Sequence, residues 1–413
     1  MASRALLACV VRLRYGSDEM QWSRSHVPSP MKSGTRILFF TTEDWYFCSH
    51  RLPVARAARE AGAEVHVVTR VANHGEAIRS EGFTLHPLRA MRRRSSSPLR
   101  EAATVAELTA IYHAVRPDLV HHVALKPVVY GSLAARLARV PAVVNALAGM
   151  GYLFTDDPEK QAAAWSRVAI RAVFRSVLRL PNAVVLFQNP DDRAVLTDAG
   201  VVALDRTAII RGSGVDMAEF ESTLEPQGVP LIVFGGRMLR QKGVGELHEA
   251  ARLLRERGVR CRVALVGDPD PENPASISEE TLHDWAEAGA VEYWGRRSDM
   301  PAILRQAHIA CLPSYREGLP KFLLEAASCG RPIVTTDTPG CREICIDGEN
   351  GFLVPLFDPK SLADRLQALV EDESLRRRMG AAGRALVERE FSAEGVAART
   401  LELYDSLLER GRV

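Results

Sequence analysis

Four features that mark common protein classes are missing from this 413-residue sequence. No apolar run is long enough to span a membrane, which disfavours an integral membrane protein. The seven cysteines are scattered, and no Cys or His pair accompanies Cys341 and Cys345, which argues against a disulfide framework and a zinc site. The first strand-to-helix turn, residues 42–50, has no glycine, whereas a dinucleotide-binding fingerprint needs G-x-G-x-x-G there. No internal repeat of solenoid length is present.

The composition is that of a soluble globular protein of a reducing compartment, with 46% apolar and 25% charged residues. A chain of this length exceeds one ordinary core and predicts two domains. The net charge of +2 hides an asymmetry: residues 31–195 carry an excess of Lys and Arg, and residues 196–413 an excess of Asp and Glu. We predict a disordered extension (1–30), an N-terminal domain (31–217), a C-terminal domain (218–392) and a final helix (393–413).

Short apolar, β-branched segments alternate with helical segments along both predicted domains. This pattern is typical of a parallel sheet with helices on both faces. The predicted strands are residues 36–42, 64–69, 118–123, 142–146, 183–187 and 207–210, then 231–234, 262–266, 291–294, 309–312, 332–335 and 351–354. The predicted fold class is therefore α/β, with two Rossmann-like domains facing across a cleft.

Residues 309–327 read as a strand, a turn and a helix, with Glu317 in the turn and Glu325 on the helix. The helix start offers free N–H groups and a positive dipole end, which suit a phosphate or a polar sugar. The carboxylates can accept hydrogen bonds from sugar hydroxyls or from a ribose diol. Taken by spacing alone, two such glutamates are more often ordinary surface charges.

The residues around the glutamates make the pattern specific. Glu317-Gly-Leu-Pro, Leu-Leu-Glu325-Ala and the following Gly-Arg-Pro-Ile-Val-Thr-Thr segment resemble the E-x7-E region of glycosyltransferase family 4, whose members are retaining enzymes of the GT-B fold. The resemblance spans residues 36–410 and is strongest over 235–355. It implies a final helix that returns to the N-terminal domain. It also implies that Glu317 and the backbone of Gly318, Leu319, Pro320 and Lys321 hold the donor sugar, with Glu325 on the ribose.

A basic turn follows the first strand of the second domain. Arg237 and Lys242 lie in this glycine-containing turn, and an Arg fork with a Lys point charge suits a diphosphate. A solvated surface turn is the ordinary alternative. The resemblance implies the diphosphate clamp of family 4, with Gly236 beside it, and catalytic roles for Arg237, Lys242, Glu317 and His122.

Other donor contacts are implied by the same resemblance. Gly267 and Asp268 match a loop near the nucleotide, and Trp294, Gly295 and Arg296 match a loop that holds the base. The pair Asp268 and Asp270 superficially resembles a metal-binding D-x-D motif. We predict no metal and no cofactor.

The acceptor side is predicted from the N-terminal domain. His121 and His122 end a strand at the edge where α/β sheets place ligands, although only one of two adjacent residues can face a cleft and histidines are more often structural. The runs around Trp45, His50, Lys126, Gly149 and Gly151 resemble family 4 enzymes that build bacterial surface polysaccharides on lipid carriers. These five residues are the predicted acceptor contacts.

Cations of the N-terminal domain suggest a location. Arginines recur every fourth residue from residue 167 to residue 179, and residues 92–94 are all arginine. Basic helices with aromatic neighbours can lie on anionic membranes, although solvated arginines on a surface helix explain the pattern equally well. We predict a cytoplasmic protein in peripheral contact with a membrane.

The resulting hypothesis is a retaining, metal-independent glycosyltransferase that moves a sugar from a UDP- or GDP-sugar to a lipid-linked or polysaccharide-precursor acceptor. The alternatives are a nucleotide-sugar epimerase of the same fold, for which no clear set of acid and base residues is evident, and a scaffold without activity. Nucleic-acid binding is disfavoured because the basic residues lack interleaved aromatic residues.

Overall fold

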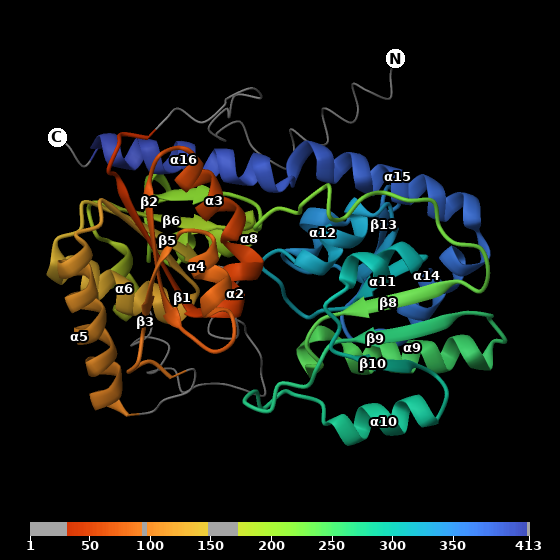
Figure 1. The fold of residues 1–413 in the computed structure, drawn as a ribbon. Coiled ribbons are helices and arrows are strands. Elements are labelled where there is room, and N and C mark those ends of the chain that lie inside the picture. Colours follow the sequence, from red (N-terminus) through yellow and green to blue (C-terminus); the bar gives the residue numbers. More distant parts are fainter. Residues whose placement is uncertain (1–30, 93–96, 148–171, 411–413) are drawn as a thin grey trace, which may run out of the picture.

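The computed structural model describes residues 31–92, 97–147 and 172–410. Two separate parallel sheets, each flanked by helices, divide this part of the chain into an N-terminal and a C-terminal domain (Figure 1). The predicted α/β class with two Rossmann-like domains is confirmed.

The N-terminal domain has a seven-stranded sheet of order β3-β2-β1-β4-β5-β6-β7. The predicted strands all form, and the prediction missed the short strand β3. Its elements are β1 (Arg36–Glu43), α2 (Asp44–His50), α3 (Leu52–Glu60), β2 (Glu64–Arg70), α4 (Gly75–Ser80), β3 (Thr84–Pro87), α5 (Pro98–Val115), β4 (Leu119–Val123), α6 (Leu125–Ala138), β5 (Ala142–Leu147), β6 (Ala183–Phe187), α8 (Pro190–Asp198), the 3-10 turn Leu204–Arg206 and β7 (Thr207–Ile209).

The C-terminal domain has a six-stranded sheet of order β10-β9-β8-β11-β12-β13. Its elements are β8 (Leu231–Gly235), the 3-10 turn Arg240–Lys242, α9 (Val244–Glu256), β9 (Arg262–Val266), α10 (Glu279–Glu287), β10 (Glu292–Gly295), α11 (Met300–Gln306), β11 (Ile309–Leu312), α12 (Lys321–Ser328), β12 (Ile333–Thr336), α13 (Cys341–Ile344), β13 (Gly351–Val354), α14 (Pro359–Glu371), α15 (Glu373–Glu390) and α16 (Ala393–Arg410).

Each sheet contains one point where the chain reverses its direction of travel across the strands. In the N-terminal domain this switch point lies between β1 and β4, and in the C-terminal domain between β8 and β11. Ligands of such sheets bind beyond the carboxyl ends of the strands at the switch point, because the loops there diverge. The loops after β8 and β11 are therefore where the fold itself places a site.

The central strands are largely apolar because helices cover both faces of each sheet. All residues of β4, β5, β6, β8 and β11 are buried, and the apolar side chains of β8, β9, β11 and β12 join a single C-terminal core. Among the described residues, no helix is both long and apolar enough to cross a membrane.

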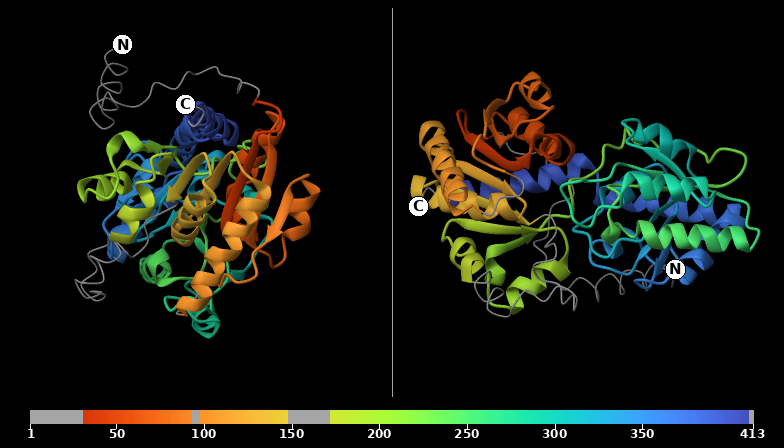
Figure 2. Two further views of the ribbon diagram at one scale, coloured as in Figure 1. Left: turned by 90° about the vertical axis from the view of Figure 1, so that its left-hand side faces the viewer. Right: turned by 90° about the horizontal axis from the view of Figure 1, so that it is seen from below.

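The final helix connects the two domains. After α15, the backbone of Phe391 and Ala393 bonds to Val215, and α16 then packs against α3 of the N-terminal domain. Tyr404 of α16 reaches His121 of β4 with its hydroxyl. Figure 2 shows the two sheets side by side with the C-terminal helices running past both. The expected return of the chain to the N-terminal domain is confirmed.

Candidate active site

The loops after β8 and β11 bring the predicted catalytic pair together. Lys242 ends the 3-10 turn that follows β8, and its Nζ forms an ion pair with a carboxylate oxygen of Glu317 in the loop after β11. The side chains are 22% and 12% exposed. Gly243 makes this approach possible: it has φ +74°, and a Cβ there would lie 2.0 Å from the Pro313 carbonyl oxygen. The topology thus joins two residues that are 75 positions apart.

Arg237, the second predicted cation, also lies at this switch point. Its Nη1 donates to Oδ2 of Asp270 at 2.7 Å, and the Arg237 side chain is 45% exposed. Asp270 itself is buried, and its backbone N–H donates to Ser276 Oγ at 2.8 Å. Asp270, one of the two carboxylates of the D-x-D-like pair, is therefore engaged by a guanidinium.

The predicted nucleotide-side residues form one connected set of loop ends. Gly236 N–H donates to the Val266 carbonyl at 3.0 Å, and Gly267 N–H donates to the Gly295 carbonyl at 2.8 Å. Met238 N–H donates to the Asp268 carbonyl at 2.9 Å. Beyond them, the Trp294 Nε1–H donates to Glu292 at 2.9 Å, and Arg296 is exposed. The structure therefore gathers these predicted residues at the carboxyl ends of β8, β9 and β10.

Helix α12 starts directly after the Glu317 loop. Pro320 is its N-cap residue, and no side chain of the described residues caps this end. Glu325 lies one turn in, 9% exposed, with an oxygen 3.3 Å from Lys321 Nζ. Burial raises the pKa of the Glu325 carboxyl, and Lys321 opposes that shift. The helix start supplies free N–H groups, and Glu325 supplies a largely buried acceptor beside them.

A tight backbone contact holds the Glu317 loop in place from the side of β12. Gly340 has φ +82°, and a Cβ there would lie 2.4 Å from the Glu317 carbonyl oxygen and 2.6 Å from that of Gly318. Glu317 N–H also donates to the Pro339 carbonyl at 3.2 Å. The position of Glu317 is therefore fixed by backbone packing as well as by Lys242.

Part of the predicted acceptor set lies at the edge of the N-terminal sheet near the C-terminal domain. His50 ends α2, its ring stacks on Tyr46 with a centroid distance of 4.2 Å, and Ser49 Oγ contacts its Nδ1. Burial is the main cause that lowers the pKa of His50 to about 3, with smaller contributions from the positive charges of Lys321 and Lys242. Both lysines belong to the C-terminal domain, so their charges act on His50 across the junction between the domains.

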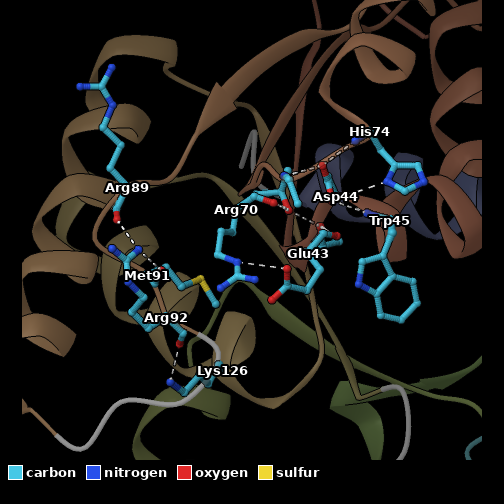
Figure 3. A network of polar contacts seen from close by, with 12 residues as sticks. Glu43, Asp44, Trp45, Arg70, His74, Arg89, Met91, Arg92 and Lys126 are labelled. Carbon is cyan, nitrogen blue, oxygen red and sulfur yellow. Dashed lines mark hydrogen bonds and ion pairs between the residues drawn. The ribbon is translucent and has the colours of Figure 1, made fainter. Parts of the chain in front are cut away.

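Figure 3 shows the N-terminal edge around Trp45. The Asp44 carboxylate accepts hydrogen bonds from the Ala72 and His74 N–H groups at 2.7 and 2.8 Å, which ties the start of α2 to the loop after β2. Trp45 follows with 39% exposure. Lys126 Nζ donates to the Arg92 carbonyl at 3.0 Å. The glycine-free first turn is therefore a short helix, and it presents an exposed indole.

The structure does not favour the catalytic role predicted for His122. Its ring is fully buried, with Nδ1 2.8 Å from Asn145 Oδ1 and Nε2 3.0 Å from the Tyr112 hydroxyl. Helix α6 closes over it so tightly that a Cβ on Gly131 would lie 2.4 Å from the ring. His121 points to the other face of the sheet, toward α16. Neither ring reaches the domain junction, because both faces of the sheet are covered by helices.

The remaining N-terminal predictions have mixed outcomes. Gly149 and Gly151, like Arg167 and Arg171, lie outside the described residues. Arg175 and Arg179 donate to the carbonyls of residues 199–200, just after α8. These two arginines thus stabilise the negative end of a helix dipole, which is a structural use of part of the predicted basic stripe.

Sequence reasoning missed a set of contacts between the domains. Arg316, next to Glu317, forms an ion pair with Asp192, and Asn189 Nδ2 donates to the Gly318 carbonyl at 2.8 Å. The only sequence signal was local: Asn189 before Pro190 is a typical helix N-cap, and its side chain does accept from Asp192 N–H. Arg51, which follows the predicted contact His50, is 4% exposed, and its Nε has no partner among the described residues.

Comparison with known proteins agrees with this arrangement. Residues 216–386 match the family described as glycosyl transferases group 1, and residues 36–180 match the family described as glycosyl transferase 4-like. Together the two matches cover most of both domains.

Two curated relatives match nearly the whole chain. One is the N,N'-diacetylbacillosaminyl-diphospho-undecaprenol alpha-1,3-N-acetylgalactosaminyltransferase of Campylobacter jejuni, 27% identical, with 87% of this chain and 95% of the relative covered. The other is the putative glycosyltransferase EpsD of Bacillus subtilis, 26% identical, with 91% and 97% covered.

Solved structures show the same fold. The sucrose-phosphate synthase of Thermosynechococcus elongatus aligns with a TM-score of 0.73 at 20% identity, covering 91% of this chain and 100% of that one. Anabaena HepE in complex with UDP-glucose aligns with a TM-score of 0.70 at 19% identity, covering 90% and 99%. Taken together, these findings show that the chain is a glycosyltransferase of the GT-B fold, whose C-terminal domain matches the group 1 family and whose N-terminal domain matches the 4-like family.

Proposed function

We propose that this glycosyltransferase moves a sugar, with retention of its anomeric configuration, from a UDP- or GDP-sugar to a lipid-linked saccharide, without a bound metal ion. The observation that carries the proposal is the Lys242–Glu317 pair at the β8/β11 switch point, beside the uncapped start of α12. It combines a cation for a diphosphate with an acceptor for sugar hydroxyls in one place.

The donor's diphosphate has two cations and a helix start available. Lys242 has three N–H donors, so it can hold Glu317 and a phosphate oxygen together. Arg237 uses one N–H for its hydrogen bond to Asp270 and has four more, and its 45% exposure leaves it accessible. Positive charge beside a departing diphosphate stabilises the charge that develops in the transition state. In the proposal the base lies against residues 294–296, the ribose against Glu325 and the sugar against Glu317.

The proposed reaction breaks the bond between the anomeric carbon and the diphosphate oxygen. A hydroxyl oxygen of the acceptor forms the new bond on the same face of the sugar, and its proton passes to the leaving phosphate. Lys242 and Arg237 neutralise the diphosphate as it departs. In this scheme the protein binds and orients the two substrates and stabilises the charge of the leaving diphosphate. Orientation and electrostatic stabilisation are large contributions to the rate enhancement of enzymes.

The acceptor part of the proposal has two supports. The Campylobacter jejuni relative acts, by its name, on a diphospho-undecaprenol-linked sugar. In this chain the N-terminal domain presents an exposed Trp45, and Figure 3 shows the cations Arg70, Arg89, Arg92 and Lys126 farther along the same edge, to the left of the indole. An indole prefers the water–lipid interface, and cations are attracted to anionic head groups. We propose that the protein works in the cytoplasm in peripheral contact with an anionic membrane.

The test is nucleotide release by the purified full chain from UDP- and GDP-sugars, with and without undecaprenyl-diphosphate-linked sugar and with and without EDTA. We expect release from one donor that depends on the lipid, persists in EDTA and is lost in Glu317→Gln. The exposed Glu280→Gln is the matched control and should retain wild-type activity. The anomeric coupling constant of the product, measured by NMR, decides between retention and inversion. Interconversion of nucleotide sugars without lipid would refute the transferase in favour of an epimerase.

A further inference from the structure

The donor-sugar loop, which we define as residues 316–319, is held by both domains. From the C-terminal domain, the turn at Gly340 packs against the carbonyls of Glu317 and Gly318. From the N-terminal domain, Asn189 at the start of α8 also contacts the Gly318 carbonyl, and Asp192 forms an ion pair with Arg316. The conformation of this loop therefore depends on contacts from both domains.

Two fully buried side chains of the N-terminal domain, Asn189 and Asp192, make the contacts with the loop. Asn189 Nδ2 donates to the Gly318 carbonyl at 2.8 Å and to Asp192 Oδ2 at 3.2 Å, while its Oδ1 accepts from Asp192 N–H at 2.7 Å. Asp192 is 0% exposed, and its other oxygen forms an ion pair with Arg316. A buried carboxylate without a counter-charge is costly, so Asp192 strongly favours the position of Arg316 seen here.

These contacts determine how the loop presents its polar groups. In a trans peptide the carbonyl and the following N–H point in opposite directions. Because Asn189 holds the Gly318 carbonyl, the Leu319 N–H points away from Asn189. Leu319 is also fixed, since its Cδ2 would lie 2.5 Å from a Cβ on Gly212 in the segment after β7. The segment on both sides of Glu317 is therefore placed by residues of the N-terminal domain.

We infer that Asn189 and Asp192 are positioning residues for donor-sugar binding: although they belong to the domain predicted to bind the acceptor, they orient Glu317 and its neighbouring peptides toward the donor. The inference rests on the proposed function and adds a coupling to it. The donor sugar is bound productively only when α8 of the N-terminal domain contacts the loop. Separation of the domains frees Arg316 and the Gly318 carbonyl and loosens the sugar site.

The test uses two variants of the full chain. Asn189→Ser keeps a good helix N-cap but removes the amide donor to Gly318. Asp192→Asn keeps the shape but removes the charge that holds Arg316. A second cross-domain ion pair gives a matched control: Arg211 Nε lies 2.9 Å from Glu343 Oε2, with side chains 16% and 5% exposed. The double variant Arg211→Gln/Glu343→Gln removes this pair and leaves Asn189, Asp192 and residues 316–319 unchanged.

The measurements are kcat and KM for the donor, KM for the acceptor, and donor hydrolysis without acceptor. We expect kcat/KM for the donor to fall by roughly 10- to 100-fold in both variants, because displacements of about 1 Å at a reacting centre have effects of that size. Donor hydrolysis should fall in parallel, and the acceptor KM should stay within about twofold of wild type. The control should lose less than about threefold. In the pair Asp192→Asn and Arg316→Gln, the double variant should be no worse than the more impaired single variant.

Two results would overturn the inference. One is an increase in acceptor KM alone, which would make Asn189 and Asp192 acceptor contacts. The other is an equal loss in the control, which would make them ordinary interface residues. If wild type turns over no nucleotide sugar, the proposed function fails, and calorimetric titration with UDP- and GDP-sugars then decides the inference separately. Donor affinity should fall in Asn189→Ser and remain in the control, and unchanged affinity in Asn189→Ser would refute it.

Discussion

The Lys242–Glu317 pair predicts that stability and activity respond differently to its removal. Lys242→Met keeps the apolar stem but leaves a Glu317 carboxylate that is only 12% exposed without its cation. Removing one partner of a fully buried pair costs about 3–5 kcal/mol, and the partial exposure here reduces our expectation to about 2 kcal/mol. Glu317→Gln should cost only about 1 kcal/mol, because the Lys242 ammonium can reach water on its flexible stem.

The double variant separates the two effects. If the pair couples as the structure indicates, Lys242→Met/Glu317→Gln should be about as stable as Glu317→Gln alone, instead of showing the sum of both losses. Activity should not recover, since kcat falls by about 100- to 1000-fold when one stabilising charge or donor is lost. Urea denaturation followed by circular dichroism gives the free energies of unfolding, and nucleotide release gives kcat. Additive losses of stability, or a Lys242→Met variant with wild-type kcat, would refute the reasoning.

Three further predictions concern other parts of the molecule. Burial lowers the pKa of His122 from 6.5 to about 4, so the unfolded chain binds a proton that the folded chain does not between these values. The free energy of unfolding should therefore decrease as pH falls from 6.5 to 4, by up to about 1.4 kcal/mol per pH unit for this group, and urea denaturation of His122→Gln against wild type should show a flatter profile. Gly340→Ala should displace the Glu317 carbonyl and reduce kcat at least tenfold, with a lowered thermal midpoint, whereas wild-type kinetics would contradict the packing argument. Arg237→Lys should raise the donor KM about tenfold because the fork geometry is lost, with acceptor KM unchanged; a changed acceptor KM alone would place Arg237 outside the donor site.

The fold could be predicted because its signals are local and repeated. Strands buried on both faces are mostly apolar, and their alternation with helices specifies a parallel sheet with right-handed crossovers. The site at β8 and β11 followed from the resemblance around Glu317 and Arg237, and the sheet order then explains why Lys242 meets Glu317. The prediction that the structure does not favour is the catalytic role of His122, whose ring is buried beneath α6. Alternation along a strand distinguishes two faces, but in this sheet both faces are interior, and ligands lie at the strand ends.

The contacts that join the domains could not be predicted for a different reason. Asn189 and Asp192 have a complete local explanation as a helix cap and first-turn acid, so nothing in the sequence indicates that they also reach residues more than 120 positions away. Similarly, the glycine-free first turn excluded a dinucleotide fingerprint without indicating that Asp44 would start a helix there. The cross-domain contacts and the helix at Asp44 both depend on tertiary contacts between segments that are distant in the sequence.

The structure also changes how the predicted cations act. The sequence suggests a clamp of two free positive charges, Arg237 and Lys242, yet each lies against a carboxylate, as does the neighbouring Lys321. Such pairing costs the site little binding capacity, because an ammonium has three donors and a guanidinium five, and each pair uses only part of them. The carboxylates instead restrict the rotamers of long side chains before the donor arrives, which lowers the entropy lost on binding. The site is therefore organised by its own ion pairs, and Glu317 serves both as the predicted sugar ligand and as the group that orients Lys242.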